Sequence, residues 1–419
     1  MKFSSPFASL LVLVSITAVS PAPSNGRGEG VVRFPLTRKS TGIAGHADLS
    51  ALTTQLTRVS NKYRQTFAAF EANTGSAHPL SGRMMSSISK RDGSAVLLTN
   101  QGTDLWYGEI DVGTPKQKFT VSIDTGSTDL FLPSDSCVLT CQGHAMYYAD
   151  KSSTAKDQKN LVALTYGQGQ VIGDEYTDDV FIGGYEAPNQ AFLDAFQYSS
   201  DFSNTNFKPD GLAGFAFEEI SVLKAPSIFE TISNSGVLVE NVFSVKLSST
   251  SGESELYIGG TNTDLYVKNT LTYTPVTTQG YWQVNLGAIS RDGSTVASNA
   301  ASIIDTGTTL IIASDAAAEA YYKNIPGSSN STEGEATYYT IPCETIGSYT
   351  PTLTFGGRDF TVSKETFNLG PESSGSSDCT AGIAGMSSVD FWVVGGVFLQ
   401  NVYAVFDKEN LQVGFAELA

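Results

Sequence analysis

The chain has 419 residues, which is long for a single hydrophobic core and predicts two lobes. Tyr, Phe, Thr, Ser and Val are abundant and recur in short alternating runs, so we expect a mostly β fold. Residues 92–419 hold 14 Lys and Arg against 39 Asp and Glu, a net charge of −25. Such an acidic body repels nucleic acid, so nucleic-acid binding is excluded as a function.

Residues 1–22 have the composition of a secretory signal peptide. Lys2 precedes an apolar run from about Phe7 to Val19, and small residues follow that run. The run is shorter than the ~20 residues that a membrane span needs. We therefore expect a secreted, extracellular protein without a membrane anchor.

Residues 23–91 form a basic leader that ends in the dibasic pair Lys90 and Arg91. Residues 1–91 hold 11 Lys and Arg against 3 Asp and Glu, so the net charge changes sign at this pair. A basic segment joined to an acidic body by Lys-Arg indicates a processing site. Attraction between the two parts would hold the leader at neutral pH, and acid would weaken that attraction by protonating carboxylates.

The four cysteines indicate disulfides. In a secreted chain an even number of cysteines favours pairing, and we expect Cys137–Cys141 and Cys343–Cys379, each within one half of the chain. Cys137, Cys141 and His144 could instead be three zinc ligands. His144 is the one histidine after residue 91, and the motifs of zinc peptidases, serine hydrolases and nucleotide loops are missing. We therefore expect no metal and no cofactor, and carboxylates remain as the catalytic groups.

The phrase Asp-Thr-Gly occurs twice, in SIDTGSTDL at 122–130 and in IIDTGTTL at 303–310. Each copy follows an apolar strand, and the triplet Asp-Thr-Gly is expected by chance less than once in a chain of this length. Two lobes related by an approximate two-fold axis would bring Asp124 and Asp305 together. Two adjacent carboxylates cannot both ionise cheaply, so one keeps a proton. Such a pair can activate a water for attack on an amide carbonyl.

The residues that follow each aspartate have expected supporting roles. The glycines allow the two loops to approach closely. The threonines next to the aspartates can hydrogen-bond across the axis, and the hydroxyl residues after the glycines can orient the carboxylates. These supporting residues are Thr125, Gly126, Ser127, Thr306, Gly307 and Thr308.

The sequence resembles the pepsin-like aspartic endopeptidases of the fungal secreted type over about residues 92–419. WYGEIDVGTPKQKFTVSIDTGSTDLFLPS resembles the opening strands and the first active loop of that family. DGLAGFAF and WVVGGVFLQNVYAVFDKENLQVGFA resemble the segments that pass beside the two aspartates. The resemblance implies a bilobal pepsin-like fold, with pseudo-symmetric β-rich lobes at 92–270 (N-terminal) and 271–419 (C-terminal) and a substrate cleft between them.

The resemblance also implies which residues contact the polypeptide substrate. LTYGQGQVIGDEYTDDVFIGG is similar to the family's flap hairpin, which places the flap tyrosine at Tyr166, followed by Gly167 and Gln168. Gln168 carries no charge for a substrate lysine, so we expect apolar or aromatic side chains at the cut. Phe131 stands where many members have Trp and would fill the same apolar wall. GYWQV places Tyr281 on the primed side of the cleft.

By the same resemblance, we expect residues 23–91 to be an inhibitory prosegment and the chain to be the zymogen of a pepstatin-sensitive acid endopeptidase. We also expect a monomer. Lys62 and Tyr63 could enter the cleft and neutralise the aspartates, or could lie on a solvated helix face. The alternative function is a catalytically inactive relative that binds peptides or proteins, although both aspartates and the flap tyrosine are present. Asn330 begins an N-S-T sequon in a polar loop, so we expect glycosylation there.

Overall fold

The computed structural model describes residues 32–39, 46–84, 105–166, 169–250 and 252–419. The expected signal peptide, the pair Lys90 and Arg91, and the flap residues Gly167 and Gln168 lie outside the described residues. Within the described part, the fold is mostly β, as the composition predicts. No helix in this part is long and apolar enough to cross a lipid bilayer.

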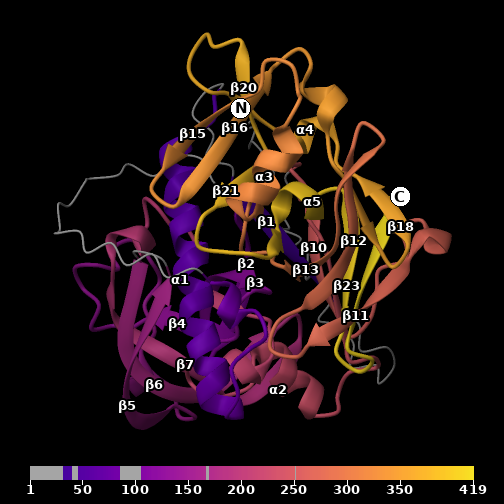
Figure 1. The fold of residues 1–419 in the computed structure, drawn as a ribbon. Helices are drawn as coiled ribbons and strands as arrows, with labels where there is room; N and C mark the ends of the chain where they lie inside the picture. The colour runs from indigo at the N-terminus through magenta and orange to yellow at the C-terminus, as the bar shows by residue number, and fades with distance from the viewer. Residues whose placement is uncertain (1–31, 40–45, 85–104, 167–168, 251) are drawn as a thin grey trace, which may run out of the picture.

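The first half of the body forms one twisted sheet, drawn in purple and magenta in Figure 1. Its strands are β2 (Leu105–Val112), β3 (Gln117–Asp124), β4 (Leu130–Pro133), β5 (Lys156–Tyr166), β6 (Gly169–Ile182), β7 (Tyr185–Tyr198) and β8 (Gly211–Gly214). The long hairpin of β5 and β6 carries the flap, and β6 pairs with β7 along most of its length.

The second half forms a corresponding sheet, drawn in orange and yellow. Its strands are β12 (Gln283–Arg291), β13 (Ser294–Ile304), β14 (Ile311–Ala313), β15 (Ser329–Glu333), β16 (Ala336–Pro342), β17 (Thr352–Phe355), β18 (Arg358–Thr361), β19 (Asn368–Pro371), β20 (Asp378–Ala381), β21 (Ile383–Met386) and β22 (Trp392–Val394). Asn330 is exposed on the β15–β16 hairpin.

A third sheet contains strands from both halves and from the leader. It consists of β1 (Val32–Lys39), β9 (Val242–Lys246), β10 (Ser254–Ile258), β11 (Thr272–Thr278), β23 (Val402–Asp407) and β24 (Gln412–Glu417). Its aromatic core includes Phe243 stacked on Phe406 at 4.6 Å between ring centroids, with Trp282 packed against both. This shared sheet joins the two halves.

The two halves repeat one strand pattern around the Asp-Thr-Gly phrases. In the first half, β3 runs parallel to β8, and β4 pairs with β7 and β8. In the second half, β13 runs parallel to β22, and β14 pairs with β21 and β22. The apolar-apolar-Gly segments at β8 and β22 thus lie beside the strands that lead into the aspartates, as the sequence resemblance implies.

Short helices complete the body, and one long helix belongs to the leader. The short helices are α2 (Ile228–Asn234), α3 (Asp315–Tyr322), α4 (Lys364–Phe367) and α5 (Gly396–Leu399). The long helix, α1 (Leu49–Thr74), begins where the Asp48 side chain accepts a hydrogen bond from Ala51 N and ends at Gly75, whose φ of 74° only glycine adopts readily.

Helix α1 buries an apolar stripe against the body. Leu52, Leu56, Val59, Tyr63, Phe67 and Phe70 recur every three or four residues and are buried. Figure 1 shows α1 extending from strands β15 and β16 of the second half down across the first half. The helix therefore lies between the two halves, above the strands that end in the active loops.

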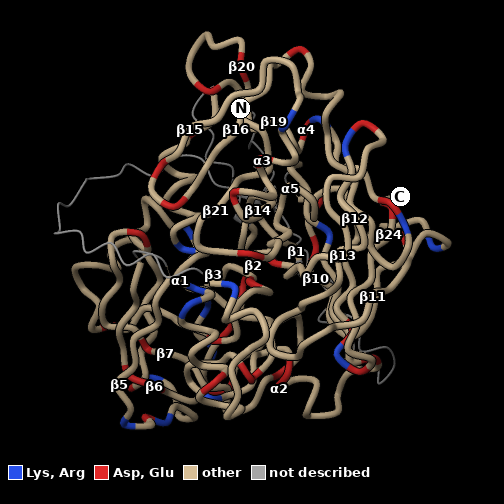
Figure 2. The backbone as a smooth tube through the Cα atoms, viewed as in Figure 1, with Lys and Arg blue, Asp and Glu red and all other residues tan. Residues whose placement is uncertain are grey.

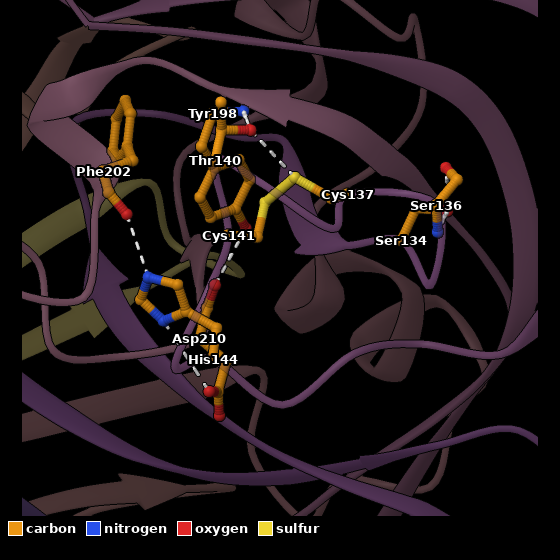
Figure 3. Close-up of a disulfide and its surroundings, with 9 residues drawn as sticks. All are labelled: Ser134, Ser136, Cys137, Thr140, Cys141, His144, Tyr198, Phe202 and Asp210. Carbon is orange, nitrogen blue, oxygen red and sulfur yellow. Dashed lines mark hydrogen bonds and ion pairs between the residues drawn. A yellow bond between two sulfur atoms is a disulfide. The ribbon is translucent and has the colours of Figure 1, made fainter.

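Both expected disulfides are present, Cys137–Cys141 and Cys343–Cys379. The alternative interpretation of Cys137, Cys141 and His144 as zinc ligands is wrong, because both sulfurs are used in the disulfide. Figure 3 shows His144 beside this disulfide, with Nε2 at 2.9 Å from the carbonyl oxygen of Phe202 and Nδ1 at 3.8 Å from Asp210 Oδ1.

Candidate active site

Each aspartate stands at the end of a buried strand and is held by its own loop. Asp124 is the last residue of β3; its Oδ1 accepts from Gly126 N at 2.9 Å and its Oδ2 accepts from Ser127 Oγ at 2.6 Å. The loop Asp305–Thr308 repeats both bonds at 2.9 and 2.7 Å. Two donors on each carboxylate fix its orientation before any substrate arrives.

The two threonines next to the aspartates bind the loops to each other. Thr125 Oγ1 accepts from Thr306 N at 3.0 Å and donates to the Ile304 carbonyl at 2.8 Å. Thr306 Oγ1 makes the mirror-image pair of bonds, with Thr125 N at 3.0 Å and with the Ile123 carbonyl at 2.7 Å. These four buried bonds cross the pseudo-two-fold axis, so the two halves are locked together beside Asp124 and Asp305.

The glycines of the two loops lie directly against the opposite carboxylates. A Cβ placed on Gly126 would lie 2.6 Å from the carboxyl atoms of Asp305. A Cβ on Gly307 would overlap the carboxyl group of Asp124 in the same way. Only glycine permits this close approach. The structure therefore brings together Asp124 and Asp305, which are 181 residues apart in the sequence.

The leader places a lysine between the two aspartates. Lys62 Nζ lies 3.1 Å from Asp124 Oδ1 and 2.8 Å from Asp305 Oδ2, and the Tyr63 hydroxyl donates to the same Asp305 oxygen at 3.0 Å. Lys62 is 4% exposed and Tyr63 is fully buried. Of the two interpretations of this pair, the solvated helix face is excluded by this burial.

The environment shifts the pKa values of the three charged groups in different directions. Burial raises the pKa of Asp124 to about 6, against the effect of the Lys62 ammonium. Burial also acts on Asp305, but Lys62 and the donors around it outweigh burial and lower the pKa of that carboxyl. Burial opposes the charge on Lys62, yet the two carboxylates raise its pKa.

The flap tyrosine and its neighbours form an aromatic wall over the first half of the site. Tyr166 ends β5, and its buried ring lies 5.7 Å from both Phe131 and Phe202, between centroids. Phe131 also packs against Tyr198 and Phe202. Phe131 therefore lies in an aromatic cluster beside Tyr166, and its contact with substrate stays a prediction.

Tyr281 lies on the other side of the aspartates and is covered by the leader. Its ring is fully buried and stands 5.5 Å from the rings of both Tyr63 and Phe67 and 5.3 Å from that of His78. Its hydroxyl forms a short hydrogen bond with Thr66. The leader thus occupies the space that a substrate side chain needs if it is to contact Tyr281.

Several contacts of the leader were not singled out from the sequence. Gln55 donates to Thr309 Oγ1 at 2.8 Å, and Gln65 makes two bonds to the backbone of β5, with Thr165 N and the Ala163 carbonyl. The signal was nevertheless in the sequence: these glutamines recur with Arg58 and Lys62 at spacings of three and four residues, which places all four on one face of a helix.

Comparison with known proteins agrees with this geometry. The model of the family described as eukaryotic aspartyl protease matches residues 105–418. An aspartic protease of Phaffia rhodozyma is 36% identical over 425 aligned positions, covering 98% of each chain. Pepsin A of Sus scrofa is 34% identical over 75% of this chain and 81% of its own, and cathepsin D of Homo sapiens is 34% identical over 77% and 83%.

The matched region contains both active loops, the flap strands and the strands that pass beside the aspartates. Proteins of this kind bind polypeptide substrates in a cleft between two lobes, and here the leader helix occupies the corresponding position between the halves. The chain therefore belongs to the eukaryotic aspartyl protease family and is a pepsin-like, aspartic-type endopeptidase.

Proposed function

We propose that the chain is made as a zymogen of a secreted acid endopeptidase, and that residues 23–91 block the aspartate pair until acid releases them. The observation that carries this proposal is the Lys62 ammonium between Asp124 and Asp305. A buried lysine bound to both carboxylates occupies the place of the water that the reaction needs. The pair then cannot hold and activate a water.

Acid release follows from the same contacts. Asp305 has a lowered pKa beside Lys62, so its attraction for the leader is present above the ordinary aspartate pKa and is lost as the pH falls through the lowered value. Figure 2 shows Asp and Glu positions spread over both halves of the body, so acid removes long-range attraction for the basic leader at the same time. The whole leader then separates from the cleft.

Once the leader has gone, Asp124 and Asp305 share one proton and hold a water between them. The charged carboxylate takes a proton from the water as its oxygen attacks the carbonyl carbon, and the protonated carboxyl donates its proton to the carbonyl oxygen. The resulting diol breaks down when a proton passes to the amide nitrogen and the C–N bond cleaves. In this proposal Tyr166, Gly167 and Gln168 close over the substrate, and Phe131 and Tyr281 line its pockets.

The remaining features support secretion and processing. Residues 1–22 have the composition of a signal peptide, and the two disulfides fit an oxidising compartment. Lys90 and Arg91 mark where the leader would be cut, either by a processing protease or by the enzyme itself. We propose a monomer without a membrane anchor, glycosylated at the exposed Asn330.

The decisive experiment is acid activation of the full chain. Wild type at pH 3 should lose about its first 91 residues and digest unfolded globin, and pepstatin should stop the digestion. Asp124→Asn should lower kcat at least about 1,000-fold, since one catalytic carboxyl is gone. Asp150→Asn changes an exposed carboxyl by the same atoms and should digest normally. Digestion by the Asp124→Asn chain, or none by folded wild type, would refute the proposal.

A further inference from the structure

Among the described residues, the leader makes one ionic contact in the first half of the body that the blocking of the aspartates does not explain. Arg58 Nη2 donates to the Asp201 carbonyl at 2.9 Å, and Arg58 Nε lies 3.9 Å from Asp201 Oδ2. The guanidinium also stands 5.6 Å from the centroid of the Phe202 ring. The two charged side chains are only 17% and 15% exposed. An arginine is thus held in a half-enclosed place that offers a carboxylate, a carbonyl and an aromatic face.

This place lies beside the flap and on one defined side of the aspartates. The Phe202 ring packs on Tyr166, and a Cβ on Gly169 of the flap hairpin would lie 2.9 Å from the Phe202 ring and 3.2 Å from Asp201 Cβ. Arg58 precedes Lys62 by one helical turn, about 6 Å along the axis. Tyr63 and the later turns of α1 lead the other way, towards Tyr281.

The segment that carries Asp201 is firmly built into the first half. Figure 3 shows the His144 ring bonded to the Phe202 carbonyl, and this ring stands next to the Cys137–Cys141 disulfide. The Phe202 side chain is buried among several aromatic rings, namely Phe131, Tyr166, Tyr198 and Phe207. The carboxylate therefore keeps its position when the leader leaves.

The contact between Arg58 of the leader and the Asp201 carboxylate leaves hydrogen-bonding groups unpaired. Asp201 Oδ2 and Arg58 Nε are both buried, and neither has a hydrogen-bond partner among the described residues. They face each other at 3.9 Å, which is too long for a direct bond. An arginine or lysine on an extended peptide can approach this oxygen directly and make the charge-assisted bond that the helix does not make.

We propose that Asp201, with its own carbonyl and the Phe202 ring, forms a subsite for a basic side chain of the substrate. The rise of about 6 Å along the helix axis from Arg58 to Lys62 corresponds to the length of about two residues of extended chain. If Tyr281 lies on the primed side, the basic residue precedes the scissile bond by about two to three residues. The inference rests on the proposed function, because the leader must first leave. It is separate from the apolar preference expected at the cut itself.

The test uses acid-matured enzyme from the full chain and three peptides that cut at the same apolar pair. They carry arginine, citrulline or norleucine two residues before the bond, and a second set carries the change three residues before it. At pH 5, kcat/KM for the arginine peptide of one set should exceed that for citrulline about 10-fold. Asp201→Asn should bring this ratio close to 1, and Asp150→Asn should leave it unchanged.

The outcomes separate this inference from the proposed function. If wild type cuts none of the peptides, the proposed function fails. If it cuts all of them but treats arginine and citrulline alike in both sets, or if Asp201→Asn keeps the preference, the subsite is refuted. The wild-type comparison of arginine with citrulline decides the matter even if the variant does not fold. A reversed preference for glutamate peptides in Asp201→Lys would be further support.

Discussion

The leader contains a histidine whose burial predicts a measurable effect on the proposed acid activation. His78 is 1% exposed and packs against the rings of Phe67, Phe70 and Tyr281 at 4.8 to 5.3 Å between centroids. Its Nδ1 accepts from Leu80 N at 3.2 Å, and its Nε2 has no partner among the described residues. Of the three rings, only Tyr281 titrates, and burial raises its pKa, so it stays neutral in acid. Protonated His78 would be a buried, unpaired charge.

The size of the effect follows from the pKa. Burial lowers the pKa of His78 from 6.5 to about 4 in the docked leader. A released leader regains the ordinary value, so it binds the proton first as the pH falls. The contribution of neutral His78 to docking is complete above pH 6.5 and is lost progressively down to pH 4. At pH 5 the loss amounts to about 2 kcal/mol, a factor of about 30 in the docking equilibrium.

The substitution His78→Phe keeps an aromatic ring in this place and removes the ring nitrogen that binds a proton in acid. Its leader should therefore stay docked at pH 5, and leader loss, followed on gels from pH 7 to 3, should slow at least about 10-fold relative to wild type. Below pH 4 the two rates should converge, because protonation of the carboxylates that attract the leader then releases it in both proteins. His46→Phe is the matched control, since His46 is a leader histidine that is only half-buried. Identical pH profiles for wild type and His78→Phe would refute the reasoning.

Two further substitutions test the centre of the site. Lys62→Met leaves two buried carboxylates without their cation, so docking of the leader should weaken by about 3 kcal/mol and the activation midpoint should move to higher pH. The control Arg64→Gln breaks a half-exposed pair with Glu335 and should change the docking free energy by less than about 1 kcal/mol. Equal effects of both would contradict the central role of Lys62. Thr125→Val removes two buried bonds across the axis and should cost about 2–3 kcal/mol in thermal unfolding; an unchanged melting temperature would show that the loops are held otherwise.

Much of the catalytic centre could be predicted from the sequence because its information is local and repeated. Each aspartate, its glycine and its hydroxyl partner stand within four consecutive residues, and each loop follows an apolar strand. Two copies of one motif implied a two-fold arrangement and hence a meeting of Asp124 with Asp305. The mostly β fold followed from the composition and is confirmed by the structure. The family and the endopeptidase activity followed from the resemblance over residues 92–419 and are confirmed by the comparisons.

The leader shows where sequence reasoning stopped. The helical pattern after Asp48 was clear, but the sequence left open whether Lys62 faced solvent or the aspartates. The spacing placed Arg58 on the same helix face as Lys62, but neither Arg58 nor His78 could be assigned a role, because each acts through a partner far along the chain: Asp201 for the first and Tyr281 for the second. Spacing defines the face of a helix but not what that face meets.

The sequence by itself determined the chemistry of this protein: two carboxylates, their local donors and the two-fold plan that joins them. Only the tertiary structure decided which groups surround the two aspartates. It placed Lys62 between them, buried His78 with no hydrogen-bond partner for its Nε2 among the described residues, and placed Asp201 beside the flap hairpin. The physical reason is that hydrogen-bond donors within a loop are set by neighbouring residues, whereas burial and charge pairing depend on segments that meet only after the chain has folded.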